Sequence, residues 1–135
     1  MAQVVFYEKP GCTGNSQQRA MLVAAGHELD VRDLLRTPWT AETLHPFFGG
    51  LPVVQWFNPR APAVRDREID PSQLDEAAAL AAMIAAPILI RRPLLQVGDE
   101  RRCGFDPKTI NRWIGLLAAD ARRIDAEACQ STRCP

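Results

Sequence analysis

The stretch Tyr7-Glu8-Lys9-Pro10-Gly11-Cys12-Thr13-Gly14-Asn15-Ser16 decides how the rest of this chain folds. It follows an apolar run, Val4-Val5-Phe6, and precedes a segment with helical spacing at residues 17–25. A cysteine in such a strand-to-helix turn lies where the first N–H groups of the helix have no partner. Those groups and the helix dipole favour an anion, so they favour the thiolate form of Cys12. We therefore expect a nucleophile at Cys12; the alternative is an inert small residue in a turn.

The residues around this turn predict a βαβ unit. Residues 4–7 are β-branched and aromatic, which is typical of a short buried strand. Either Asn15 or Ser16 should cap the following helix, and Gly26 should end it. Apolar and charged side chains alternate over residues 28–32, which predicts a second strand with one exposed face. Because a helix joins the two strands, we expect them to be parallel with a right-handed crossover.

The middle of the chain, from about residue 38 to residue 86, predicts a helical insertion. Thr40 should cap a short helix that runs to about residue 45. The apolar residues 53–57 are either a strand or a helical piece. Asp70, followed by Pro71, indicates the start of a longer helix that ends before Pro87. The expected inner face of that helix consists of Leu74, Ala77, Ala78, Ala81 and Ile84.

The last third predicts a hairpin followed by a helix. The apolar segment 88–97 is interrupted by Gly98-Asp99, and residues 101–105 can return as an antiparallel partner. Asp106-Pro107 repeats the helix-start signal. The apolar positions of that helix are Ile110, Trp113, Ile114 and Leu117. Parallel first strands, a final hairpin and covering helices together predict an α/β fold with the thioredoxin arrangement.

Composition and charge narrow the class of protein. The 135 residues are 47% hydrophobic and 24% charged, and the formal net charge is zero. This balance is ordinary for one globular domain and argues against bulk binding to nucleic acid or to an anionic membrane. No apolar run approaches the roughly 20 residues of a membrane span. Since no secretory signal is evident, we expect a cytoplasmic protein. We also expect it to be a monomer.

The chain has four cysteines and two histidines with which to form a metal site or a disulfide. No pair has the C-x-x-C spacing, so we expect no metal site. Cys103 on a predicted strand is expected to be a buried apolar residue. From about residue 120 to residue 135 we expect a flexible tail. Three roles are open for Cys129 and Cys134 in this tail. They are incidental thiols, they form a labile disulfide with each other, or one of them resolves oxidised Cys12.

Three motifs in one order give the chain a family resemblance. Residues 7–12 resemble the active-site turn of the ArsC/Spx family, the glutaredoxin-linked arsenate reductases and their relatives. Residues 34–40 are similar to the family's L-x-T-P-x-T segment, and residues 87–95 to its P-I-L-I-x-R-P signature. Within the family, residues 12–15, 56–58 and 61–64 look most like the branch called nitrogenase-associated proteins. These are encoded among nitrogen-fixation genes.

The resemblance implies a thioredoxin-like mixed sheet flanked by helices, with an ArsC-type helical insertion, over residues 1–119. It also implies a cis peptide bond between Arg92 and Pro93 that faces Cys12. Arsenate reductases of this family hold their oxyanion with one cysteine and three arginines. Arg92 fits the middle arginine, although it could instead form a surface salt bridge. The first falls near Gln55, with Arg60 close by, and the third falls at Gly104.

The resemblance thus assigns Cys12 and Arg92 as the catalytic pair. The residues expected to bind substrate or an anion are Thr13, Gly14, Asn15, Arg60, Arg91 and Pro93. Asn15 stands where Spx-like members carry a second cysteine, which excludes a local dithiol switch.

Three functions remain open at this point. The first is a thiol-dependent oxidoreductase of the arsenate reductase class, with no bound cofactor, that uses glutathione or glutaredoxin as reductant. The second is a non-catalytic, Spx-like regulatory protein whose partner belongs to nitrogen fixation. The third is a glutathione-dependent thiol transferase without an oxyanion substrate.

Overall fold

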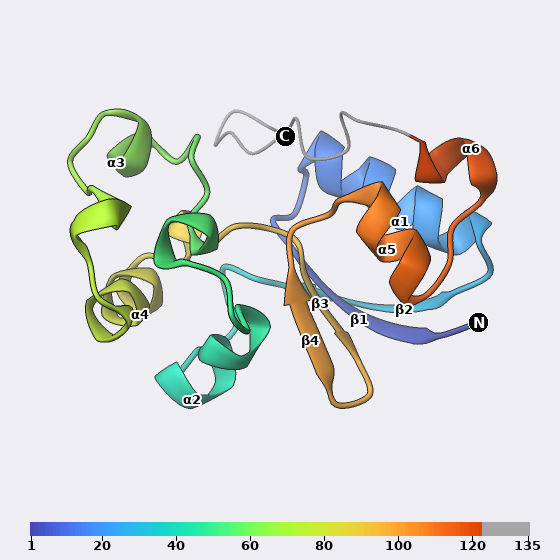
Figure 1. Cartoon of the computed structure of the whole chain (residues 1–135), viewed down its shortest axis with the longest axis horizontal. Coiled ribbons are helices and arrows are strands. Elements are labelled where there is room, and N and C mark those ends of the chain that lie inside the picture. Colours follow the sequence, from blue (N-terminus) through green and yellow to red (C-terminus); the bar gives the residue numbers. More distant parts are fainter. Residues whose placement is uncertain (123–135) are drawn as a thin grey trace.

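A four-stranded mixed sheet forms the centre of the computed structural model, which describes residues 1–122. Its strands are β1 (Gln3–Glu8), β2 (Glu28–Asp33), β3 (Leu94–Val97) and β4 (Glu100–Cys103). They lie side by side in the order β2-β1-β3-β4 (Figure 1). β1 and β2 are parallel, whereas β3 is antiparallel to both β1 and β4. The predicted parallel pair and hairpin are therefore confirmed.

One face of the sheet is covered by α1 (Thr13–Ala24) and α5 (Pro107–Trp113), which lie on the same side of it in Figure 1. The core on this face contains Val4, Phe6, Met21, Leu22, Leu95, Phe105 and Ile110. Because side chains alternate along a strand, Val5 and Tyr7 of β1 point to the opposite face. The two faces therefore carry separate cores.

The second core is built by the segment between β2 and β3, which is mostly helical. Its helices are α2 (Ala41–Leu44), α3 (Pro62–Arg65) and α4 (Glu76–Ala85). Four 3-10 turns lie between and after them: η1 (His45–Phe47), η2 (Val53–Trp56), η3 (Pro71–Gln73) and η4 (Pro87–Leu89). Residues 53–57 are thus a helical piece, and Phe57 forms only a single antiparallel bridge with Ile90.

Tyr7 joins the sheet to this helical segment. The centroid of its ring lies 4.9 Å from that of Trp39 and 5.6 Å from that of Phe47. The indole N–H of Trp39 donates to the carbonyl of Leu34 at 2.9 Å, so the buried ring has its polar atom satisfied. Such aromatic pairs contribute about 0.5–1.5 kcal/mol each beyond the area they bury. The strand that leads into the Cys12 turn is therefore anchored just before its end.

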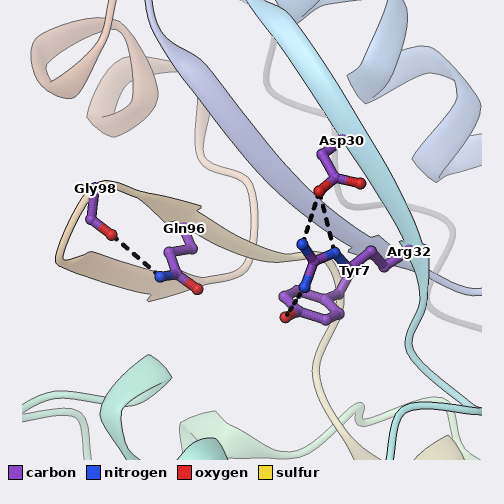
Figure 2. A network of polar contacts seen from close by, with 5 residues as sticks. All are labelled: Tyr7, Asp30, Arg32, Gln96 and Gly98. Carbon is purple, nitrogen blue, oxygen red and sulfur yellow. Dashed lines mark hydrogen bonds and ion pairs between the residues drawn. The ribbon is translucent and has the colours of Figure 1, made fainter.

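The same face of the sheet becomes polar toward β2 and the hairpin, as Figure 2 shows. Arg32 Nη2 donates to Asp30 Oδ2 at 2.8 Å, and Arg32 Nη1 donates to the Tyr7 hydroxyl at 3.4 Å. On the neighbouring hairpin, Gln96 Nε2 donates to the carbonyl of Gly98 at 3.1 Å. Asp30 and Arg32 are exposed, so this part of the face meets solvent while the insertion covers the rest.

Two helices differ from their predicted extent. Asp70 caps only η3, and α4 begins at Glu76 after its own cap, Asp75, whose carboxylate accepts the N–H of Ala78 at 2.7 Å. The predicted inner face is wrong at Ala77, Ala78 and Ala81, which are exposed, whereas Leu74 and Ile84 are half-buried against the core. Alanines lie all round this helix, so the larger Leu80 and Met83 decide which face is buried.

The C-terminal helix is shorter than its apolar spacing predicts. α5 ends at Trp113, and Gly115 has φ +94°, a left-handed conformation that favours glycine. Leu117 consequently lies outside the helix and is 51% exposed. A short helix, α6 (Ala118–Ala121), ends the described part of the chain. No helix among residues 1–122 is both long and apolar enough to cross a membrane.

Candidate active site

Cys12 is itself the N-cap of α1. Its backbone is extended, and its Sγ accepts the N–H of Asn15 at 3.5 Å. The helix therefore begins at Thr13 instead of residue 17, and the predicted caps Asn15 and Ser16 are wrong. The sulfur takes the place of a capping oxygen and satisfies one of the N–H groups that a helix start leaves unpaired. Cys12 is 2% exposed, so this contact is shielded from water.

Asn15 closes the turn that carries the sulfur. Its Oδ1 accepts the N–H of Lys9 at 3.1 Å, and its Nδ2 donates to Gln18 Oε1 at 2.8 Å. Both Asn15 and Gln18 are 0% exposed. Since buried amides are costly unless they are hydrogen-bonded, this pair fixes one conformation of the turn. Asn15 thus contacts Cys12 with its backbone and braces the preceding residues with its side chain.

Thr13 and Gly14 occupy the first two positions of α1. Thr13 is exposed and Gly14 is buried. Backbone N–H groups at these positions have no partner within the helix. The two residues therefore present donors, but no charged side chain, beside the sulfur.

The Arg92–Pro93 peptide bond is cis, as the resemblance implied. Pro93 directly precedes β3, and the antiparallel register places it at the edge of the sheet where β1 ends. Cys12 follows that end of β1 after one tight turn. Arg92 is 1% exposed, which rules out a surface salt bridge. The fold thus brings Cys12 and the Arg92–Pro93 bond to one edge of the sheet.

The other two predicted arginines differ in placement. Arg60 is exposed on the turn that follows η2. Arg91 is half-buried, its backbone N–H donates to the carbonyl of Trp56 at 2.9 Å, and its Nη1 donates to the carbonyl of Gln55 at 3.5 Å. The position expected for a first arginine, Gln55, therefore contributes a backbone acceptor. Arg91 and Arg92 are held beside the cis bond, whereas Arg60 lies on an exposed loop.

Asn58 is a polar residue of this region that the sequence analysis did not assign. It is 0% exposed, its backbone N–H donates to the carbonyl of Leu89 at 2.8 Å, and its Oδ1 accepts the N–H of Arg60 at 3.0 Å. Within residues 1–122 its Nδ2 has no hydrogen-bond partner. Leaving such a donor unsatisfied costs about 1–3 kcal/mol, so Asn58 is a candidate donor to a bound acceptor. The signal in the sequence was a polar residue directly after two aromatic ones, Trp56 and Phe57.

Glu8 is the last residue of β1 and the acidic group closest in sequence to Cys12. It is 8% exposed and pairs with Arg19 of α1, with 2.6 Å between Glu8 Oε1 and Arg19 Nε. Burial raises the pKa of the Glu8 carboxyl above its usual value, although Arg19 opposes that shift. The ion pair ties the end of the strand to the helix that Cys12 caps.

The remaining cysteines are Cys103, which ends β4 at this same edge, and two that lie outside the described residues. Cys103 is half-buried against the core of the insertion and not fully buried as predicted. Cys129 and Cys134, with most of the predicted tail, fall outside residues 1–122. His27 is buried and forms hydrogen bonds with the backbone of Ala2 and Gly115. Among the described residues, no cluster of three His, Cys, Asp or Glu side chains could hold a metal ion.

The fold and the helix-capping cysteine define a thioredoxin-like thiol protein. The chain belongs to the ArsC family, whose sequence model matches residues 7–113. A relative from Rhodospirillum rubrum, the uncharacterized 15.7 kDa protein in the draG 3′ region, is 51% identical over 132 residues. That alignment covers 98% of this chain and 92% of the relative.

Solved structures agree with this assignment. The chain superposes on the YffB protein with a TM-score of 0.69 at 25% identity, over 84% of this chain and 99% of that one. It superposes on an arsenate reductase from Vibrio cholerae with a TM-score of 0.68 at 26% identity, over 82% of this chain and 97% of that one. The protein is therefore an arsenate-reductase-like member of the thioredoxin fold.

Proposed function

We propose that this protein is a thiol-dependent redox protein in which Cys12 is the nucleophile and Arg92 binds the anionic group of the substrate. The observation that carries the proposal is the capping contact between Cys12 Sγ and the N–H of Asn15. A sulfur that replaces a capping oxygen at a helix start faces the positive end of the helix dipole. Arg92 fits its role because a guanidinium offers several donors in a geometry suited to oxyanions.

Cys12 has no second thiol in its own turn, and this sets the stoichiometry of turnover. With a mixed disulfide, the Cys12 thiolate forms a new S–S bond to the glutathione sulfur, and the substrate leaves with the electron pair as a thiolate. A second glutathione thiolate then attacks the Cys12–glutathione disulfide, which releases oxidised glutathione and restores Cys12. With arsenate, Cys12 and one glutathione together supply two electrons, which reduces arsenic(V) to arsenic(III) and leaves the same mixed disulfide. Glutathione or glutaredoxin is the reductant in both cases, because Asn15 occupies the position of a local second thiol.

A coupled assay tests the proposal. The protein is mixed with glutathione, glutaredoxin, glutathione reductase and either arsenate or a glutathione mixed disulfide, and consumption of NADPH is recorded. We expect turnover in at least one arm, and its loss by at least about 100-fold in Cys12→Ser. Cys103→Ser is the matched control and should retain the rate. A rate that is identical in the wild type and Cys12→Ser contradicts the proposal.

One finding favours a second candidate, a regulatory protein that binds a partner in nitrogen fixation. Gln55 and Gly104 stand where the resemblance expects two arginines, so an oxyanion would meet fewer charges here. The name of the Rhodospirillum rubrum relative, with its reference to the draG 3′ region, supports looking for that partner among nitrogen-fixation proteins. Absence of Cys12-dependent turnover in every arm of the assay, from a folded protein, favours this candidate.

A further inference from the structure

Gly104 provides a seat for the side chain of Arg91. A Cβ atom on Gly104 would lie 2.6 Å from Arg91 Cζ, 2.6 Å from Nη2 and 2.7 Å from Nε. The guanidinium thus occupies the space that any other residue would fill with its side chain. On its other side, Arg91 Nη1 donates to the carbonyl of Gln55 at 3.5 Å. The charged group is therefore held between the end of the hairpin and the η2 segment.

This seat lies at the edge of the sheet that carries the candidate site. Gly104 directly follows β4, and its N–H donates to the carbonyl of Pro93 at 2.9 Å. Arg91 immediately precedes the cis Arg92–Pro93 bond. β1 ends at the same edge, and the Cys12 turn follows it. Arg91 thus belongs to the segment next to the cis bond, and its guanidinium packs on Gly104 at the end of the hairpin.

We propose that Gly104 and Arg91 act together as a charge selector, which makes Cys12 react faster with anionic small disulfides than with neutral ones. The inference rests on the proposed function, because it takes Cys12 as the nucleophile. A carboxylate on the incoming disulfide is attracted by the seated guanidinium while the Cys12 thiolate attacks the near sulfur. The Cys12–S bond forms as the disulfide S–S bond breaks, and the far sulfur leaves as a thiolate with the electron pair.

The physical basis is preorganisation of one charge. A free arginine side chain loses rotamer entropy when it engages an anion, and a seated one has already lost it. Gly104 has φ +80°, which favours glycine on its own account. The experiment must therefore separate the seat from this backbone requirement.

The test measures the rate at which Cys12 is modified by two disulfides, with the adduct at Cys12 quantified by peptide mass spectrometry. One reagent is the disulfide of thionitrobenzoate, which carries two carboxylates; the other is dithiodipyridine, which is neutral at the same pH. The readout is the ratio of the two rates for the wild type, Arg91→Met, Gly104→Ala and the double variant. Arg101→Met is the matched control, because Arg101 lies on the same hairpin and donates to Asp99 at its far end.

We expect Arg91→Met to lower the anionic-to-neutral ratio by about threefold to tenfold, and high salt to lower the wild-type ratio. Gly104→Ala should lower it similarly, because its Cβ expels the guanidinium, and the double variant should add nothing further. Arg101→Met should leave the ratio within about twofold of the wild type. Thermal unfolding confirms that each variant is folded.

Three results would overturn the selector. Ratios unchanged in both Arg91→Met and Gly104→Ala, with Cys12 still reactive, overturn it and leave the proposed function intact. An effect of Gly104→Ala that persists at full size on top of Arg91→Met overturns it too, because the glycine then acts through its backbone alone. A wild-type Cys12 that reacts with neither reagent overturns the proposed function, and the selector with it.

Discussion

Asn15 braces the turn that holds Cys12, and its loss should affect both stability and reactivity. Asn15→Ala removes the acceptor for Lys9 N–H and the donor to Gln18, all in a buried setting. We expect a loss of about 2 kcal/mol in the free energy of unfolding, measured with urea. We also expect the alkylation rate of Cys12 in this variant to differ from that of the wild type, because the turn no longer fixes the sulfur.

A neighbouring residue supplies the control for this prediction. Ser16 is exposed in the same turn of α1, and Ser16→Ala should change the stability by less than about 0.5 kcal/mol. Equal losses in the two variants, or an Asn15→Ala protein as stable as the wild type, would show that the buried amide does not brace the turn.

Glu8 makes a pH-dependent contribution whose sign follows from its burial. Its pKa is raised above 4.5 in the folded protein, mainly by desolvation, so the folded state binds this proton more tightly than the unfolded state. Ionised Glu8 therefore costs stability at neutral pH, and the cost disappears as the pH falls through the raised pKa. We expect Glu8→Gln to be more stable than the wild type at neutral pH and to lose this advantage on acidification.

Urea unfolding at a series of pH values measures this difference, and Glu28→Gln, exposed on β2, reports the background effect of removing one carboxylate. An advantage of Glu8→Gln that grows as the pH falls contradicts the prediction.

At the scale of single residues, the sequence singled out Cys12 and Arg92 as candidates, and the structure places both at one edge of the sheet, but their surroundings could not be predicted. A cysteine between a strand and a helix can be recognised from one continuous stretch of sequence. The buried amide of Asn58 and the seat of Arg91 on Gly104 are not, because each depends on segments that meet only in the folded chain. A glycine also gives no hint of what fills the space beside it.

Among the elements, His27 links the two ends of the described chain. Its Nδ1 accepts the N–H of Ala2 at 2.9 Å, and its Nε2 lies 2.8 Å from the carbonyl of Gly115, to which it donates in the tautomer that this requires. His27→Ala should lower the free energy of unfolding by about 1–3 kcal/mol, since it leaves two backbone groups without a partner. Chemical denaturation followed by tryptophan fluorescence measures the change.

His45 is the matched control because its side chain is 44% exposed and its 3.5 Å contact with Glu76 lies at the surface. His45→Ala should cost much less than His27→Ala. Comparable losses would mean that the buried histidine does not connect the ends of the chain.

The elements were predicted well by type and less well by boundary. Strand and hairpin signals came from alternation and from Gly98-Asp99, and both agree with the structure. The errors have local causes: a cysteine sulfur caps α1, Asp70 caps a turn that does not continue, and alanines hide the buried face of α4. In each case a weak local preference was decided by contacts with the rest of the molecule.

For the whole molecule, the order of strands and helices predicted the fold class, and the three motifs predicted the family. The two cores on opposite faces of the sheet could not be assigned residue by residue, because a short strand pattern does not say which side each helix covers. The cis bond was available only through the resemblance, since nothing in the local sequence distinguishes it from an ordinary proline bond.

The strand order leaves β2 at one edge of the sheet, where its outer backbone groups have no neighbouring strand within residues 1–122. An edge of this kind is a template on which copies of a chain can add to one another and aggregate. Here β2 carries Asp30 and Arg32, and the Arg32 guanidinium lies between Asp30 and the Tyr7 hydroxyl. A strand that docked there would have to bury or displace those charges. The charges of Asp30 and Arg32 in Figure 2 therefore disfavour the addition of another strand along β2.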